Sequence, residues 1–128
     1  MRLLLDTHTL LWWQTADPRL SQVAFAAISD EENEIVVSAA SAWEIAIKTR
    51  LNKLESIPGA ADRFGELIAA DGFTHLSISH RHALRAGAHP SQHKDPFDRM
   101  LAAQAELEGL RLVTTDAVFA DFGTQVLW

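Results

Sequence analysis

The chain contains no cysteine, no long apolar run and little positive charge. Without cysteine it can form neither a disulfide framework nor a thiolate metal site. No stretch approaches the roughly 20 apolar residues that a membrane span needs. Asp6 cuts the first apolar run short and no small-residue cleavage site follows it, which argues against a secretory signal peptide. We therefore expect a cytoplasmic protein with no membrane contact.

Basic residues are outnumbered, because 11 Lys and Arg stand against 17 Asp and Glu and the formal net charge is −6. This balance argues against a protein that holds nucleic acid through an overall positive field. It leaves room for a nuclease in which bound divalent metal offsets part of the acidic charge. Internal repeats and low-complexity linkers are also missing, and 128 residues suffice for one sizeable core. We expect a single domain over residues 1–128.

Short apolar segments alternate with helical patterns along the chain. We predict strands at residues 3–5, 34–38, 74–77, 111–113 and 125–127. We predict helices at residues 7–14, 20–30, 41–51, 60–70, 79–86 and 95–108, with a break at 57–59 and a loop at 88–94. Predicted helix caps are Ser21, Ser41 and Ser79 at the starts and Gly87 and Gly109 at the ends. The alternation predicts an α/β fold with a mostly parallel sheet covered on both faces.

Two of the predicted strands end in a cluster of Thr and Asp. Asp6 and Thr7 follow the strand at 3–5, and Thr114, Thr115 and Asp116 follow the strand at 111–113. A carboxylate at the tip of a buried strand is costly to desolvate, so a partner must offset that cost. Ligands of open α/β sheets lie just outside the carboxyl ends of the strands. If the two strands are parallel neighbours, Asp6 and Asp116 meet at one edge of the sheet.

Four acids lie at element ends or on helix faces that this topology could gather, namely Asp6, Glu44, Asp98 and Asp116. Oxygen-only clusters suit hard divalent ions such as Mg²⁺ or Mn²⁺. Such a cluster polarises a phosphoryl oxygen, activates water and stabilises a leaving oxygen, so phosphodiester hydrolysis is its natural chemistry. Crowded carboxylates repel one another, and without metal at least one of them should have a raised pKa.

Each acid also has a local explanation. Asp6 could cap the helix that follows it, and Asp116 could sit in a turn where Asp is favoured for its local hydrogen bonds. Glu44 precedes Lys48 by four residues, which is the usual orientation of a solvated ion pair on a helix. Taken alone, Glu44 is more often a surface residue than a site residue.

Asp95 and Asp98 compete for the third position. Asp95 stands before Pro96 and fits an N-cap with proline at the first helical position. Asp98 then falls at the third helical position, where an acid interacts favourably with the helix dipole. Local rules therefore explain both residues, and spacing alone does not choose a metal ligand between them.

Four segments carry a further signal, and they are Leu4-Leu5-Asp6-Thr7-His8, Ser41-Ala42-Trp43-Glu44-Ile45-Ala46-Ile47-Lys48, His93-Lys94-Asp95-Pro96-Phe97-Asp98-Arg99-Met100-Leu101-Ala102-Ala103-Gln104-Ala105 and Leu112-Val113-Thr114-Thr115-Asp116-Ala117-Val118-Phe119. In this order and spacing the chain resembles PIN-domain proteins, and more narrowly the VapC-type toxins of bacterial toxin–antitoxin pairs. Each segment is moderately specific, and the ordered set spans nearly the whole chain.

The resemblance implies a three-layer α/β/α sandwich, Mg²⁺- or Mn²⁺-dependent endoribonuclease activity on RNA, and a homodimer with a VapB-like antitoxin as partner. It carries over Asp6, Glu44, Asp98 and Asp116 as the four acids. Asp95 is kept as an outer residue. Asp6 and Asp98 are expected to hold the principal metal, while Asp116 and Glu44 complete its surroundings or position the attacking water.

Further residues receive supporting roles. Thr114 matches the family's hydroxyl position two residues before the last acid, and it is expected to orient carboxylates or water. Thr7, next to Asp6, is also expected to be a supporting residue of the site. Arg99 and Lys48 are predicted to contact RNA phosphates.

Other side chains have alternative interpretations. His89 and His93 are four residues apart and invite a zinc site, but Pro90 follows His89 and the segment reads as loop. With no third ligand visible, we interpret these histidines, and likewise His80 and His82, as surface residues. Adjacent tryptophans on one helix cannot both face one core, so one residue of the pair Trp12 and Trp13 is expected at a subunit or antitoxin contact.

Three rival functions remain. A receiver-like signalling module would want paired acids after the first strand, yet Thr7 and His8 follow Asp6. A phosphatase of the haloacid dehalogenase type would want a second Asp at the position of His8. A catalytically silent domain that binds an antitoxin-like peptide is the third alternative, and the intact set of acids argues against it.

Overall fold

The computed structural model describes residues 1–54 and 58–128, and in this part of the chain five strands form one parallel sheet in the order β3-β2-β1-β4-β5. The strands are β1 (Arg2–Leu5), β2 (Glu34–Ser38), β3 (Thr74–Leu76), β4 (Arg111–Val113) and β5 (Val126–Leu127). The helices are α1 (Thr7–Gln14), α2 (Gln22–Ser29), α3 (Ala39–Arg50), α4 (Phe64–Ala70), α5 (His80–Ala88), α6 (Pro96–Glu108) and the 3-10 helix η1 (Ala117–Phe122). Ile57, in the predicted break at 57–59, lies outside the described residues.

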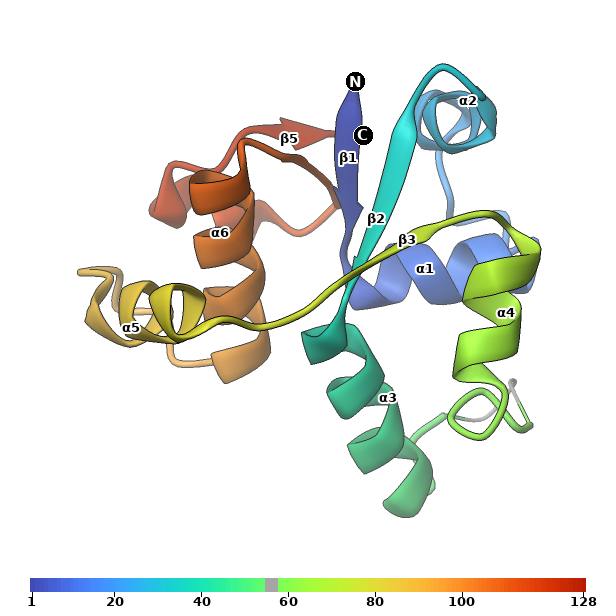
Figure 1. The fold of residues 1–128 in the computed structure, drawn as a ribbon, viewed down its shortest axis with the longest axis horizontal. Helices are drawn as coiled ribbons and strands as arrows, with labels where there is room; N and C mark the ends of the chain where they lie inside the picture. The colour runs from blue at the N-terminus through green and yellow to red at the C-terminus, as the bar shows by residue number, and fades with distance from the viewer. Residues whose placement is uncertain (55–57) are drawn as a thin grey trace.

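Alternate strand residues build a core on each face of the sheet. Leu3 and Leu5 pack with buried residues of α1, α2 and α4, while Leu4 and Leu112 pack with buried residues of α6. Successive side chains of a strand point to opposite faces, so a strand that is apolar throughout is covered on both sides. Figure 1 shows α5 and α6 on one side of the sheet and α1, α2 and α4 on the other. The predicted three-layer α/β/α sandwich is confirmed.

Most predicted helix caps are confirmed. The Ser21 hydroxyl accepts from the main chain of Ala24 at 3.0 Å, and Ser79 forms a capping box with His82. Gly109 ends α6 in the left-handed conformation, with a φ of 65°, which glycine adopts without steric cost.

The predicted start of α3 is wrong, because the helix follows β2 without a loop. Ser38, the last residue of the strand, is the N-cap, and its Oγ accepts from the main-chain N–H of Ala40 at 3.0 Å. Ser41 is instead buried in the first turn of α3, where its Oγ accepts from the hydroxyl of Thr7 at 3.0 Å. This bond fixes the start of α1 against α3.

Other boundaries also differ from prediction, among them those of α4 and α5. Helix α5 passes through Gly87 and ends at Ala88, and α4 begins at Phe64, four residues later than predicted. Gly87 costs a helix interior only about 1 kcal/mol, which tertiary packing overrides. None of the helices in the described part of the chain has the length and hydropathy to cross a membrane.

Candidate functional site

Asp6 lies at the carboxyl end of β1, directly beside the end of β4. The parallel pairing of Leu5 with Val113 makes Asp6 and Thr114 neighbours across the two strands. Asp6 is 7% exposed, and its Oδ1 accepts from the main-chain N–H of Thr9 at 2.7 Å. Its Oδ2 accepts from the hydroxyl of the buried Thr114. Both carboxylate oxygens therefore have donors that offset their desolvation and fix the orientation of the side chain.

Asp116 lies at the same edge, two residues beyond Thr114. Its main-chain N–H donates to Oγ1 of Thr114 at 3.0 Å, and its Oδ1 accepts from the main-chain N–H of Val118 at 3.0 Å. Asp116 is thus the N-cap of η1, as its local explanation anticipated, and it also stands next to Asp6. The two interpretations are compatible because a cap uses only one carboxylate oxygen.

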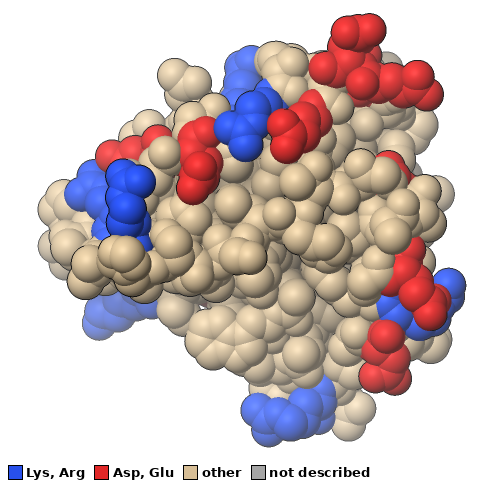
Figure 2. Space-filling view, in the orientation of Figure 1, with Lys and Arg blue, Asp and Glu red and all other residues tan. Residues whose placement is uncertain are grey.

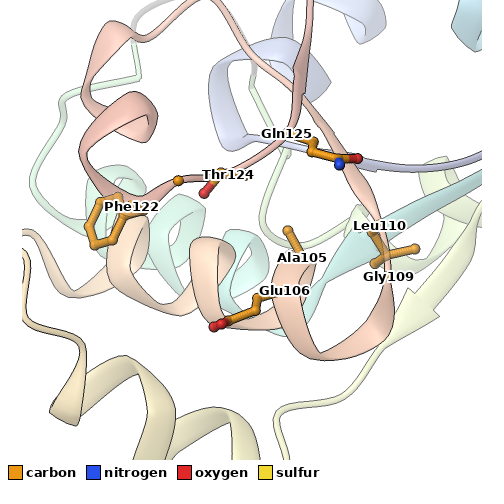
Figure 3. A pocket seen from close by; sticks show the side chains of 8 residues that line it. Ala105, Glu106, Gly109, Leu110, Phe122, Thr124 and Gln125 are labelled. Carbon is orange, nitrogen blue, oxygen red and sulfur yellow. The ribbon is translucent and has the colours of Figure 1, made fainter.

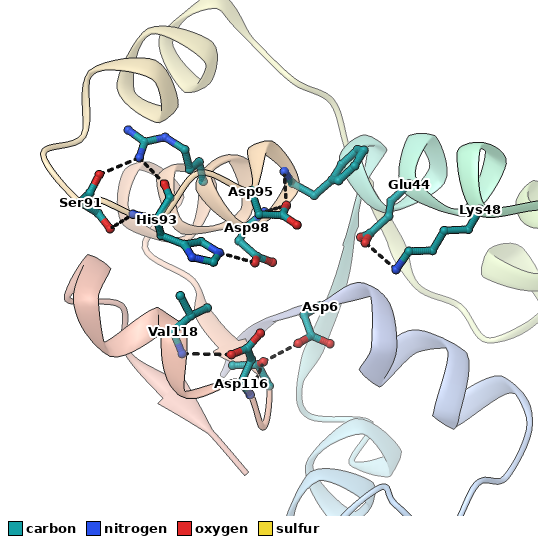
Figure 4. Close-up of polar contacts among 12 residues, drawn as sticks. Asp6, Glu44, Lys48, Ser91, His93, Asp95, Asp98, Asp116 and Val118 are labelled. Carbon is teal, nitrogen blue, oxygen red and sulfur yellow. Dashed lines mark hydrogen bonds and ion pairs between the residues drawn. The ribbon is translucent and has the colours of Figure 1, made fainter. Parts of the chain in front are cut away.

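Asp98 faces these two acids from the first turn of α6 (Figure 4). Asp95 is the N-cap of that helix, and its Oδ1 accepts from the main-chain N–H groups of Phe97 at 2.8 Å and Asp98 at 3.1 Å. The carboxylate of Asp98 instead accepts from Nε2 of His93 at 2.9 Å. The geometry therefore favours Asp98 as the third acid and gives Asp95 a structural task.

The surroundings of Asp98 disfavour its charged form. Burial raises the pKa of Asp98, the hydrogen bond from His93 opposes this increase, and the charges of Asp95 and Asp116 add to it. The prediction of a raised pKa among the acids is confirmed, but burial contributes more than the repulsion from which it was inferred. A nearby cation would stabilise the charged form.

Glu44 enters from α3, on the opposite side of the group from His93 (Figure 4). Its Oε2 lies 2.9 Å from Nζ of Lys48, one turn further along the helix. The predicted ion pair is present, yet it is not a solvated surface pair, because the Glu44 side chain is only 13% exposed and that of Lys48 28%. A largely covered carboxylate directed toward other acids needs a cation nearby, and Lys48 supplies one.

The donors of this group suit a hard divalent ion. Asp6, Glu44, Asp98 and Asp116 offer only carboxylate oxygens, the ligands that Mg²⁺ and Mn²⁺ prefer. Across residues 1–54 and 58–128, no three His, Asp or Glu side chains stand close enough together to enclose a metal ion by themselves. Mg²⁺ usually keeps several waters and takes only one or two carboxylates directly, so the arrangement fits an ion held partly through water.

Of the histidines predicted at the surface, His80 is exposed, His89 and His93 are half-buried, and His82 is buried. His82 is 3% exposed; its Nδ1 accepts from the main-chain N–H of Ser79 at 3.0 Å, and its Nε2 lies 2.8 Å from Oε1 of Glu108. His89 and His93 both stack edge-on against Phe122 and do not form a metal cluster in the described residues. Sequence reasoning missed the contact of His93 with Asp98, since a loop residue has no periodicity that would reveal its partner.

Arg99 has all five of its donors engaged within the chain. The guanidinium donates to main-chain carbonyl oxygens, which are those of Ala86 (2.8 Å), Gly87 (3.4 Å), His89 (2.6 Å), Ser91 (3.0 Å) and His93 (2.7 Å). An Arg guanidinium carries five N–H groups, so this set uses its full capacity. The predicted contact of Arg99 with RNA stays a prediction, and the geometry supports a structural role.

Trp12 and Trp13 are both half-buried. Trp12 stacks edge-on against Trp128 and lies under the guanidinium of Arg19, and Trp13 donates its Nε1 hydrogen to Asp71 at 3.2 Å. Neither ring is fully enclosed, so the expected partner contact at this pair stays a prediction.

Charged side chains are unevenly distributed over the surface. In Figure 2, Lys and Arg gather over α5 and at the far end of α3, while acidic side chains lie mainly along the upper and right borders. Arg81 and Arg85 belong to α5, and Lys48 and Arg50 end α3. The net negative charge therefore does not prevent basic side chains from gathering in two areas of this face.

A separate surface cavity of about 290 Å³ lies between the end of α6 and the segment after η1 (Figure 3). Its charged lining residue, Glu106, forms an ion pair with Arg85 at 2.6 Å. None of the four acids lines it. The cavity is therefore not part of the candidate site.

Comparisons with known proteins agree with this architecture. A family model of the PIN domain matches residues 3–124. The chain is 33% identical over 114 residues to Ribonuclease VapC22 of Mycobacterium tuberculosis, which covers 88% of this chain and 85% of that protein. Among solved structures, VapBC2 from Rickettsia felis bound to a DNA fragment from their promoter has a TM-score of 0.71 at 13% identity, covering 99% of this chain and 98% of that chain. A toxin-antitoxin complex from Klebsiella pneumoniae has a TM-score of 0.64 at 21% identity, covering 98% of this chain and 96% of that chain. At these identities the two structures establish likeness of fold.

Proposed function

The chain belongs to the PIN-domain family, and from that membership and its acidic group we propose that it is a divalent-metal-dependent endoribonuclease and the toxin of a toxin–antitoxin pair. One observation carries the proposal most directly: four acids from four separate segments face one edge of the sheet. Local caps and ion pairs explain single acids, but they give no reason for Asp98 and Asp116 to face each other against their repulsion, or for both to lie beside Asp6. The relative named Ribonuclease VapC22 supports RNA as the substrate.

We assign the acids the following roles. Asp6 and Asp98 hold the principal Mg²⁺ or Mn²⁺, directly or through water. Asp116 and Glu44 complete the surroundings of the ion or position the attacking water. A bound divalent ion supplies Lewis-acid polarisation of a phosphoryl oxygen and lowers the pKa of its water.

The protein's own contribution is to hold these carboxylates in place. Thr114 donates to Asp6, and the same hydroxyl oxygen accepts from the main chain of Asp116, so the two acids share one support. Thr7 fixes the start of α1 to α3 through Ser41, and α3 carries Glu44. Lys48 holds the carboxylate of Glu44 while no metal is bound. Such supports keep a site preorganised and reduce the cost of assembling it around substrate.

Basic side chains beside the site are proposed to guide RNA. They lie on α5 and at the end of α3, the helix that also carries Glu44, and both groups are proposed to contact the phosphates of a bound strand. Phosphate contacts of this kind position nucleic acid without reading its sequence.

An antitoxin and a second copy of the chain are the proposed protein partners. The similar structure from Klebsiella pneumoniae is a toxin-antitoxin complex, which supports the first of them. Several large apolar side chains are exposed, among them Trp43 at 57%, Phe25 at 55% and Leu84 at 69%. Contiguous exposed apolar patches mark protein contacts, and these side chains are proposed to form part of such contacts.

Cleavage of RNA by the purified chain tests the proposal. The partner-free protein is incubated with a pool of structured RNAs in Mg²⁺ or Mn²⁺, beside samples with EDTA and the variants Asp6→Asn and Asp98→Asn. Asp30→Asn, which alters an exposed acid of the α2–β2 connection, is the matched control. We expect discrete cleavage by the wild type and by Asp30→Asn, and none with EDTA or with either site variant.

Three other outcomes would change the assignment. Cleavage that persists in excess EDTA would contradict metal dependence. Loss with Asp6→Asn but not with Asp98→Asn would move the third role to Asp95. Absence of cleavage from every RNA by the folded wild type would favour the silent binding domain.

A further inference from the structure

His93 is the side chain that directly contacts the third acid. Its Nε2 lies 2.9 Å from Oδ2 of Asp98, and both side chains are mostly covered, with 30% and 24% exposed. Figure 4 shows the imidazole reaching across to the carboxylate from the segment before α6. Because a carboxylate oxygen accepts, the imidazole carries its hydrogen on Nε2 and donates it.

The segment that carries His93 is irregular, yet it is held at many points. Arg99 donates to the carbonyl oxygens of His89, Ser91 and His93. Ser91 adds two local bonds, because its N–H donates to Nδ1 of His89 at 3.0 Å and its Oγ accepts from the N–H of His93 at 3.2 Å. The main chain at His93 is therefore fixed from both sides, by a guanidinium and by a hydroxyl.

The imidazole ring is also constrained in its orientation. It meets the ring of Phe122 nearly at right angles, with 87° between planes and 5.9 Å between centroids. Phe122 belongs to η1, the short helix that Asp116 caps. The ring of His93 thus packs against the element that begins at the fourth acid while it donates to the third.

We propose that His93 is a positioning residue that fixes the carboxylate of Asp98 for metal binding. The inference rests on the proposed function, in which Asp98 holds the ion. An unsupported Asp side chain samples several rotamers, whereas a donor on Oδ2 selects one orientation before the ion arrives. Hydrogen bonds to metal-binding side chains act in this way, and their removal typically weakens metal affinity about 10- to 100-fold.

The structure offers a matched control in His89. Its ring also stacks edge-on against Phe122, at 5.0 Å between centroids, and it lies in the same segment. His89 is not hydrogen-bonded to Asp98, whose Oδ2 is engaged by His93. A loss that follows from disturbed packing on Phe122 affects both histidine variants, while a loss through Asp98 affects only His93.

Mn²⁺ binding by the full-length, partner-free chain tests the inference. Free Mn²⁺ is followed by electron paramagnetic resonance during titration of the wild type, His93→Ala, His93→Gln, His89→Ala and Asp98→Asn, with thermal unfolding of each variant as a check of folding. We expect His93→Ala to bind Mn²⁺ about 10-fold more weakly. His93→Gln should recover most of this loss, because its amide N–H donates, and His89→Ala should bind like the wild type.

The outcomes separate this inference from the proposed function. Wild-type affinity in folded His93→Ala would overturn the positioning role and leave the metal site intact. Equal losses in His93→Ala, His93→Gln and His89→Ala would also overturn it, since packing would then be the cause. If the wild type binds no Mn²⁺, or if Asp98→Asn binds as well as the wild type, the proposed metal site itself fails and the inference fails with it.

Magnetic resonance of the metal-free protein adds a readout independent of metal. In chain labelled with ¹⁵N-histidine, the His93 imidazole should show a hydrogen on Nε2. Its Nε2–H signal should move in Asp98→Asn, while the signals of His89 stay in place. A His93 ring whose hydrogen lies on Nδ1 would overturn the inference.

Discussion

Asp6 and Asp116 are linked through the single hydroxyl of Thr114. That hydroxyl donates to Oδ2 of Asp6, and its oxygen accepts the main-chain N–H of Asp116 at 3.0 Å. Thr114 is buried at the end of β4, where pairing with β1 sets it beside Asp6. The separation of the two acids is therefore determined by sheet register and one side chain.

Removing the Thr114 hydroxyl should weaken both stability and activity. Thr114→Val keeps the side-chain shape but leaves the buried Oδ2 of Asp6 without its donor, which costs about 1–3 kcal/mol of the free energy of unfolding. The rate of RNA cleavage should also fall, by about 10-fold or more, because removing the hydrogen-bond partners of metal-binding side chains typically lowers activity by that amount. Urea unfolding and single-turnover cleavage measure the two effects.

Thr114→Ser is the control for this change, because it retains the hydroxyl and loses only a methyl group. It should unfold and cleave much like the wild type. Equal activity of the Val and Ser variants would show that the bridge does not organise the acids.

Much of the fold follows from local patterns in the sequence. The apolar run before Asp6 and the one before Asp116 predict buried parallel strands, and parallel strands place their carboxyl ends at one edge, so these two acids were predictable together. Asp95 before Pro96 predicts the start of α6, and Gly109 predicts its end. Each of these features depends on a few consecutive residues.

The remaining features depend on tertiary packing. Glu44 and Lys48 have the spacing of a surface pair, and only the position of α3 beside the sheet edge shows that the pair is covered. Gln104 lies on α6 and looks like a surface residue, yet it is fully buried and its Oε1 accepts from the Ser38 hydroxyl at 2.5 Å. His93 lies in a segment whose conformation depends on hydrogen bonds from Arg99, and no periodic pattern in the sequence indicates these bonds.

Arg99→Lys should destabilise the chain without changing its affinity for RNA. Lysine keeps the positive charge, but its three donors on one nitrogen cannot reach five carbonyl oxygens spread over the end of α5 and the segment that follows it. Loss of even one such charge-assisted bond costs about 1.5–3 kcal/mol. Urea unfolding measures the loss, and filter binding of RNA in EDTA measures the affinity.

Arg81→Lys, on the exposed face of α5, is the matched control for Arg99→Lys. It keeps the positive charge that is proposed to meet RNA phosphates, so it should change neither quantity. If instead Arg99→Lys is as stable as the wild type and binds RNA more weakly, then Arg99 contacts the substrate as the sequence predicted.

Glu44 and Lys48 can be tested separately. Glu44→Gln removes a carboxylate that we assign to the site, and loss of a group that positions the attacking water should lower the cleavage rate about 100-fold or more. Lys48→Met leaves the largely covered carboxylate of Glu44 without its cation, so it should lower the free energy of unfolding by more than the about 0.3–0.5 kcal/mol of an exposed i,i+4 pair. Single-turnover cleavage and thermal unfolding of both variants distinguish a site residue from a surface pair. Full activity of Glu44→Gln would show that Glu44 serves only as the partner of Lys48 and has no role in cleavage.

The raised pKa of Asp98 predicts a specific dependence of stability on pH when no metal is present. Burial is the main cause; Asp95 and Asp116 add repulsion, and the hydrogen bond from His93 opposes it. Between the ordinary carboxyl pKa and the raised one, the folded chain binds more protons at Asp98 than the unfolded chain does. The free energy of unfolding therefore gains a contribution as the pH falls through this window, and at neutral pH the charged Asp98 carries a constant penalty.

Asp98→Asn should remove this penalty. In EDTA at neutral pH the variant is expected to melt at a higher temperature than the wild type, and the difference should shrink as the pH is lowered through the raised pKa of Asp98. Adding Mn²⁺ should reverse the order, because an ion that binds only the folded wild type stabilises it by mass action. Thermal unfolding across pH, with and without Mn²⁺, measures both effects. A variant that is less stable than the wild type in EDTA at neutral pH would contradict this prediction. It would show that the charged Asp98 stabilises the fold, where we expect it to lower the free energy of unfolding.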